Sequence, residues 1–156
     1  MTTRREFSRY GFSGAVLAIV VAATVAGCGS MMPAASNMVA FTTQLRGANE
    51  VPPVVSQGSG SVDAAFNKDT MQLRWKVTFS AMTGAATMGH FHGPAAVGAN
   101  SGVALGWANP VVTGMEGSAT LTPAQAADLM AGKWYANIHT AAFPGGELRG
   151  QMTVRN

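Results

Sequence analysis

The 156-residue sequence is poor in charge, cysteine and histidine, and each shortage limits what the protein can be. Only 11% of the residues are charged, and beyond the first 27 residues no cluster of lysine and arginine occurs, so nucleic acid is not expected as a partner. The one cysteine, Cys28, cannot form an internal disulfide. The length suits one domain and excludes a multidomain enzyme.

Basic residues are concentrated at the N-terminus. The formal net charge is +3, and three arginines against one glutamate give +2 to the first 27 residues, which leaves +1 for the rest. An apolar run over residues 11–26 follows the arginines. Because a membrane-spanning helix needs about 20 apolar residues, this shorter run predicts an export signal over residues 1–27 that is removed after translocation.

Two finer patterns refine the export signal. Residues 3–9 contain adjacent arginines followed by Glu and Phe, and they resemble a twin-arginine signal, with an ordinary secretory signal as the alternative. The run that ends at Cys28, Val-Ala-Gly-Cys, resembles a bacterial lipobox, with a plain cleavage site as the alternative. A lipid on Cys28 would anchor the protein to a membrane of the cell envelope, on the periplasmic or extracytoplasmic side, with residues 28–38 as a tether.

The remainder of the chain has the pattern of an antiparallel β-sheet. Apolar and polar residues alternate between Thr70 and Ser80, and weaker segments of the same kind are separated by turn signals. The expected strands are Val39–Leu45, Gly60–Phe66, Thr70–Ser80, Thr87–His92, Val103–Trp107, Gly114–Leu121, Trp134–Thr140 and Glu147–Val154. One helix is expected, with Thr122 as N-cap and Pro123 as its first residue. Residues 39–156 are therefore predicted to form an antiparallel Greek-key β-sandwich or barrel of about eight strands with one short helix.

All three histidines, His90, His92 and His139, lie on predicted strands. Residues two apart on a strand share a face, so His90 and His92 lie side by side, opposite their apolar neighbours and on the outside of the sheet. With His139 on an adjoining strand, three imidazoles would bind one metal ion. The Irving–Williams order favours copper, and zinc is the alternative. Three unrelated histidines with separate hydrogen bonds are the other interpretation.

Polar residues are expected on the same face as the histidines. Asn137 shares the face of its strand with His139, and Glu147 and Arg149 point outward from the last predicted strand. Glu50 lies in a loop with consecutive prolines, from which its carboxylate could reach a histidine. These groups can orient imidazole N–H groups, as the neighbours of metal ligands commonly do.

Four motifs, in this order, resemble the CHRD domain family, which is named for chordin. They are Gly-Ala-Asn-Glu-Val-Pro-Pro-Val at 47–54, His-Phe-His-Gly-Pro-Ala at 90–95, Trp-Tyr-Ala-Asn-Ile-His-Thr at 134–140 and Pro-Gly-Gly-Glu-Leu-Arg-Gly-Gln at 144–151. The resemblance runs from about Phe41 to Thr153. It implies an extracytoplasmic domain, since many bacterial members are exported and the animal namesake is an extracellular binding protein.

The histidine pattern is also similar to the copper half of Cu,Zn superoxide dismutases, another Greek-key barrel. That similarity implies copper outside the barrel, with His90, His92 and His139 in three of the four histidine roles and Arg149 as the arginine that attracts superoxide. The sequence has no fourth histidine and no disulfide pair, and it lacks the histidines and aspartate of the zinc site. Water, Glu147 or another group would fill the fourth position.

Three functions follow as alternatives. The first is a copper protein with superoxide dismutase-like activity on a small anionic substrate. The second is a protein of the cell envelope that holds or delivers copper without turnover, and the third is a metal-free binding module in which the histidines brace loops. Other chemistries are not indicated, because the sequence has no Gly-x-Ser-x-Gly elbow and no phosphate-binding glycine loop.

Overall fold

The structure, a computed structural model, describes residue 1 and residues 37–155 and contains nine strands within them. The strands are β1 (Met38–Arg46), β2 (Ser59–Asn67), β3 (Gln72–Ser80), β4 (Ala86–His92), β5 (Val103–Gly106), β6 (Glu116–Thr120), β7 (Tyr135–Thr140), β8 (Leu148–Gln151) and β9 (Thr153–Val154). They form one sheet in the order β5-β4-β7-β8-β1-β2-β3-β6, with β9 beside β1, and every pair is antiparallel. The prediction of an antiparallel all-β fold is confirmed.

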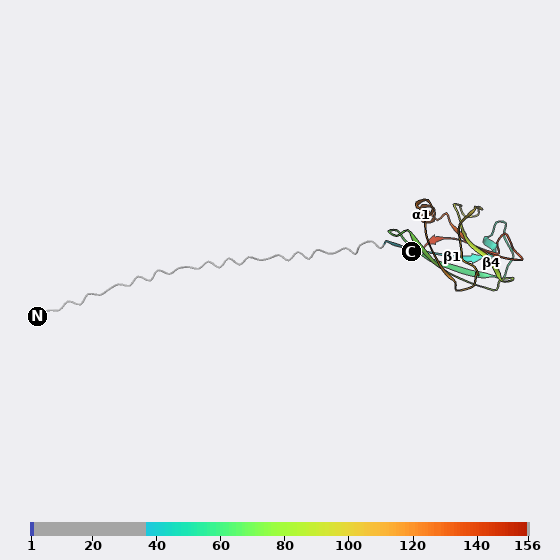
Figure 1. The fold of residues 1–156 in the computed structure, drawn as a ribbon, viewed down its shortest axis with the longest axis horizontal. Helices are drawn as coiled ribbons and strands as arrows, with labels where there is room; N and C mark the ends of the chain where they lie inside the picture. The colour runs from blue at the N-terminus through green and yellow to red at the C-terminus, as the bar shows by residue number, and fades with distance from the viewer. Residues whose placement is uncertain (2–36, 156) are drawn as a thin grey trace. The chain divides into compact units, whose positions relative to one another are not determined.

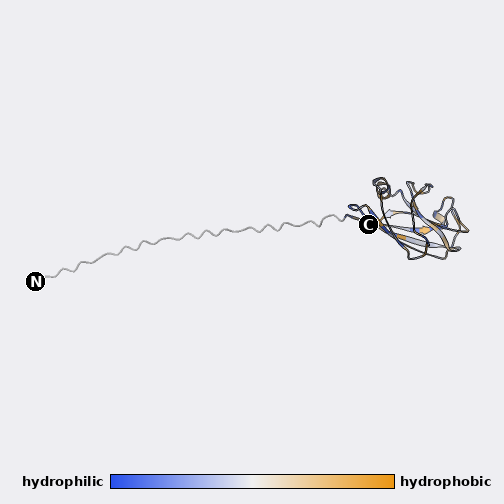
Figure 2. Ribbon diagram, viewed as in Figure 1, coloured by the Kyte–Doolittle hydropathy of each residue, from blue (hydrophilic) through white to orange (hydrophobic). Residues whose placement is uncertain are grey.

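The sheet curls so that its two halves face each other across one core. Trp75 on β3 and Phe91 on β4 belong to opposite halves of the strand order, yet their rings meet edge to face with centroids 5.3 Å apart. Phe91 also packs against Trp107 and Trp134, at 5.2 and 5.8 Å. Figure 1 shows the strands wrapped around this interior, and Figure 2 shows apolar segments in the strands at its middle. Each such side chain contributes roughly 1.5–3 kcal/mol of burial free energy.

The β2–β3 connection shows why the alternating pattern predicted the strands well and their ends less well. The side-chain oxygen of Asn67 accepts hydrogen bonds from the backbone N–H groups of Asp69 and Thr70, at 2.9 and 3.0 Å. This turn continues through Met71, whose φ is +57°. The strand therefore begins at Gln72 rather than at Thr70.

The predicted strand Glu147–Val154 is divided in two at Met152. The backbone N–H of Met152 donates to the carbonyl oxygen of Trp134 at 2.8 Å, and its side chain is fully buried. Before this residue β8 pairs with β7 on one side and with β1 on the other, whereas after it β9 pairs with β1. The ladder with β7 thus ends at Met152, although the alternation of polar and apolar residues continues through this segment.

Helix α1 (Pro123–Met130) has the bounds that its capping residues predict. The Thr122 hydroxyl accepts from the backbone N–H of Gln125, and the Gln125 side chain accepts from the backbone N–H of Thr122, which completes a capping box. Gln125 also donates to the carbonyl oxygen of Ala104, which fixes α1 to β5. A single 3₁₀ turn, η1 (Gly47–Asn49), follows β1. The described part of the chain contains no helix whose length and hydropathy would suit a bilayer span.

The first contacts of the described segment lie close to the predicted domain start at residue 39. Asn37 already donates to the Asp69 carboxylate at 2.6 Å, and β1 starts at Met38. The predicted export signal, the lipobox at Cys28 and the tether as far as residue 36 fall, apart from Met1, outside the described residues.

Candidate metal centre

The three histidines come together because β4 and β7 are neighbours in the sheet. The register pairs His90 with Asn137 and His92 with Tyr135, which sets His139 diagonally across from His90. The ring centroids lie 5.5 Å apart for His90 and His92, 5.2 Å for His90 and His139, and 6.4 Å for His92 and His139. One ring nitrogen from each residue lies within 4.8 Å of the others, so this group can hold a metal ion.

Hydrogen bonds select the nitrogen that His139 offers. Its Nδ1 lies 2.9 Å from the carbonyl oxygen of Pro144, which can only accept, so Nδ1 carries the proton. Its Nε2 is left with a lone pair and faces Nδ1 of His90 at 3.3 Å. A carbonyl partner of this kind is the usual way in which a protein fixes the tautomer of a metal-binding imidazole.

His92 provides the sharpest indication of a missing partner. Its Nδ1 lies 3.0 Å from the carbonyl oxygen of Ser101 and therefore donates there. Its Nε2 is buried and has no hydrogen-bond partner. Within residues 37–155 the other buried side-chain atoms without a partner are the indole nitrogens of Trp75 and Trp107, which are donors. Among the buried side-chain atoms of residues 37–155, only Nε2 of His92 presents an unpaired lone pair, at a cost of about 1–3 kcal/mol unless a cation or donor occupies the site.

The surroundings keep two of the imidazoles neutral. Burial lowers the pKa of His90 below its ordinary value of 6.5, and the neighbouring His139 and His92 lower it further. Burial also lowers the pKa of His92, more than the hydrogen bond to Ser101 raises it, and His139 adds to the lowering. Because a metal binds only the deprotonated nitrogen, rings that are neutral at pH 7 suit a metal site.

The site lies on the outer face of the sheet, as predicted, but loops cover that face. The side chain of Asn100, in the β4–β5 connection, donates to the carbonyl oxygen of Val51 in the β1–β2 connection at 2.9 Å. Gln151 on β8 donates to the carbonyl oxygen of Ala95 beneath the same cover. His139 is only 6% exposed, although it points away from the core.

Tyr135 is a site residue whose role the sequence reasoning missed. Its ring stacks on His92, with centroids 4.8 Å apart and planes 2° from parallel. Its hydroxyl accepts from the backbone N–H of Ser101 and donates to the Ser101 carbonyl oxygen, at 3.2 and 3.3 Å. Tyr135 therefore holds both His92 and the group that orients it. The alternation of residues in the sequence places Tyr135 on the same strand face as His139. Its hydrogen bonds with Ser101 could not be predicted from the sequence.

The ring of Tyr135 lies between Arg149 and His92. The Arg149 guanidinium stacks on the Tyr135 ring with Cζ 3.5 Å from the centroid, on the β8 side, while His92 stacks from the β4 side. It donates to the side-chain oxygen of Asn100 at 2.7 Å and to the carbonyl oxygen of Ala99. Arg149 is 2% exposed and lines a cleft of about 560 Å³. The predicted arginine is thus close to the site, but it makes no hydrogen bond to a histidine.

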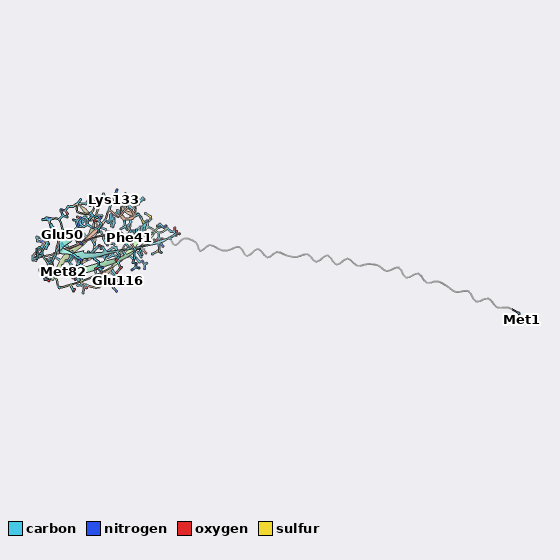
Figure 3. All side chains as sticks on the ribbon, turned by 180° about the vertical axis from the view of Figure 1, so that it is seen from behind. Met1, Phe41, Glu50, Met82, Glu116 and Lys133 are labelled. Carbon is cyan, nitrogen blue, oxygen red and sulfur yellow. The ribbon has the colours of Figure 1, made fainter. Side chains whose placement is uncertain are left out.

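Glu50 and Asn137 interact with each other rather than with an imidazole. The Asn137 amide donates to Oε1 of Glu50 at 2.6 Å and weakly to the carbonyl oxygen of Leu148. Burial raises the pKa of Glu50 from 4.5 to about 7, although Arg149 and the Asn137 hydrogen bond act in the opposite direction. Figure 3 shows Glu50 at the same end of the domain as Met82, away from Phe41 in the middle. The pair holds the β1–β2 loop against β7.

Glu147 is fully engaged elsewhere. One carboxylate oxygen accepts from the hydroxyl of Ser56 and the backbone N–H of Thr83, and the other accepts from the hydroxyls of Thr83 and Thr140. Burial alone would raise the pKa of Glu147, but these hydrogen bonds together hold it below its usual value. The carboxylate is buried and makes no hydrogen bond to a histidine. It ties the strand end next to His139 to two loops.

One comparison with known proteins gives a match. A family model described as the CHRD domain matches residues 41–152, which is more than half of the chain. No curated protein and no solved structure matches the chain.

Proposed function

The chain belongs to the CHRD domain family, and we propose that it is a metalloprotein that binds one copper ion through His90, His92 and His139. The observation that best supports this proposal is the buried, unpaired Nε2 of His92, in a group of three histidines that each have a ring nitrogen within 4.8 Å of one from the other two. A metal ion would satisfy all three lone pairs at once. Hydrogen bonds to carbonyl oxygens hold two of the rings in the required tautomer.

Copper is proposed in preference to zinc on chemical grounds. The ligand set is all imidazole, which suits both ions, and raw affinity for such a set is higher for Cu(II) than for Zn(II). Zinc stays as the alternative, because three histidines with one open position are also a common zinc arrangement.

If the copper protein is an enzyme, the reaction that we propose is superoxide dismutation. Bound copper would supply one-electron redox chemistry. In the overall reaction one superoxide is oxidised to dioxygen, and a second takes up two protons from solvent and is reduced to hydrogen peroxide. Arg149 would raise the positive potential near the site for the anionic substrate, acting from behind Tyr135 because its guanidinium is held by Asn100 and Ala99.

A copper-holding or copper-delivering role without turnover is the second candidate. The observation that favours it is the burial of Arg149 and His139 beneath the loops, which leaves little cationic surface next to the imidazoles. A role as a metal-free binding module would apply if the native protein carries no stoichiometric metal.

We also propose that the domain works outside the cytoplasm, on the surface of a membrane of the cell envelope. The export signal over residues 1–27 and the lipobox at Cys28 support this location. Acylation of Cys28 would hold the domain at the bilayer, since each buried methylene contributes about 0.8 kcal/mol.

The experiment is elemental analysis of the protein purified from its own cell envelope, followed by copper EPR spectroscopy. One copper per chain, with nitrogen hyperfine structure in the oxidised protein that is altered in His90→Ala, is the expected result. The copper-loaded domain and His90→Ala are then compared for superoxide removal. Equal rates would end the enzymatic proposal, and absence of stoichiometric metal would end the proposal of a metalloprotein.

A further inference from the structure

The site has three protein nitrogens and lacks an obvious fourth ligand. Within residues 37–155 no carboxylate or thiol joins the three histidines. Glu147, which was expected as one way to fill the gap, is occupied by four hydrogen bonds, and Glu50 accepts from Asn137. Carboxylates are therefore poor candidates, and a ligand of a different chemical type has to be sought nearby.

Met88 lies next to the histidines on the same face of the sheet. It pairs directly with His139 across the β4–β7 ladder and precedes His90 by two residues. The intervening Gly89 faces the core, because a Cβ there would lie 2.1 Å from the ring of Trp107. Since successive residues of a strand alternate, Met88 shares the outer face with His90.

Distance and exposure both suit a ligand at Met88. Directly opposed residues of an antiparallel pair have Cβ atoms about 4.5–5.5 Å apart, and the unbranched methionine side chain adapts readily. Met88 is 42% exposed, whereas its partner His139 is 6% exposed. A large apolar side chain therefore stands at the open edge of an otherwise covered polar site.

We propose that the thioether sulfur of Met88 is the fourth metal ligand. This inference rests on the proposed copper site. A set of three imidazoles and one thioether stabilises Cu(I) more than Cu(II), and it disfavours zinc, because the thioether is a soft ligand. The ion that such a site binds best is Cu(I), so the four ligands suit a protein that retains or transfers reduced copper.

The test compares the full-length wild type with Met88→Leu and with a matched control, Met130→Leu. Met130 lies on α1 and is 40% exposed, so it is similar in exposure and remote in the fold. Cu(I) affinity is measured anaerobically by competition with a chromophoric chelator, and X-ray absorption spectroscopy reports the nearest atoms around copper. Leucine is close to methionine in volume, and circular dichroism checks that each variant is folded.

A sulfur neighbour of copper in the wild type and in Met130→Leu, absent in Met88→Leu, is the expected spectrum. Cu(I) affinity should fall by roughly tenfold or more in Met88→Leu, since even the outer partners of metal ligands are worth about that much. Copper binding by nitrogen alone, with the same Cu(I) affinity in Met88→Leu, overturns the Met88 ligand but leaves the histidine site intact. A wild type that binds no copper in either oxidation state overturns both proposals.

Discussion

Nδ1 of His90 and Nε2 of His139 face each other at 3.3 Å across the β4–β7 ladder. Because Nδ1 of His139 already donates to Pro144, its Nε2 has only a lone pair to offer, so the pair needs either a proton from His90 or a shared cation. The buried Nε2 of His92 has no hydrogen-bond partner. A single metal ion would satisfy all three nitrogens.

Gly146 is predicted to be essential for the conformation of the β7–β8 loop, next to Asn137 and Glu50. Its φ is +126°, and a Cβ there would lie 2.5 Å from Nδ2 of Asn137 and 2.6 Å from Oε1 of Glu50. Gly146→Ala should lower the free energy of unfolding by about 2 kcal/mol or more. The adjacent Gly145 has open space around it, so Gly145→Ala should stay within roughly 0.5 kcal/mol of the wild type in urea denaturation. Equal effects of the two substitutions would contradict the packing described.

Glu50 should make stability depend on pH in a defined direction. Its pKa is about 7 in the folded protein against 4.5 ordinarily, so the folded state binds the extra proton between these values and stability falls as pH rises through this range. Glu50→Gln keeps an acceptor for Asn137 and cannot ionise. Its stability relative to the wild type should therefore increase from pH 4.5 to pH 8, by up to roughly 3 kcal/mol. Thermal denaturation of both proteins across this range measures the difference, and a constant difference would show that Glu50 titrates normally.

Tyr135 should affect the site in two separable ways. Tyr135→Phe keeps the ring between His92 and Arg149 but removes the hydroxyl that holds Ser101, at a cost of about 1 kcal/mol. Tyr135→Leu also removes the stacking, which is worth about 0.5–2 kcal/mol more. Metal affinity, measured by calorimetric titration, should follow the same order. If the leucine variant binds metal as tightly as wild type, Tyr135 has no positioning role.

Cys28 is predicted to carry the membrane anchor. In cells that make Cys28→Ala, the protein should move from the membrane fraction to the soluble extracytoplasmic fraction, because the acylated residue is gone. Immunoblots of the fractions and the mass of the mature chain measure this. Unchanged membrane association in the variant would argue against a lipid on Cys28.

The strands could be predicted from the sequence because they lie between one buried and one polar face. Phe91 between two histidines, and the run from Leu73 to Phe79, show the alternation directly. Ends were less predictable where a side chain made a local turn, as Asn67 does, or where pairing with one neighbouring strand stopped, as it does at Met152. These events depend on contacts that periodicity does not encode.

The candidate site was predictable in its ligands but not in its surroundings. The spacing of His90 and His92 showed that they share a face, whereas the pairing of β4 with β7 is a long-range contact that only the fold provides. The cover over the site comes from irregular loops, and its hydrogen bonds through Asn100 and Ser101 have no sequence signature. For this reason Glu147 and Arg149 were expected to point outward from the sheet, whereas both side chains are buried.

The most direct test of the central claim is thermal denaturation of the wild type and of His92→Gln, each with added copper and with a chelator. Copper at about 100 times its dissociation constant should stabilise the wild type by about 2.7 kcal/mol relative to the chelated protein. That stabilisation should weaken as pH falls below 6.5, where protons compete for the imidazoles. His92→Gln should show little response to copper. Equal melting temperatures of the wild type with copper and with chelator would contradict the account.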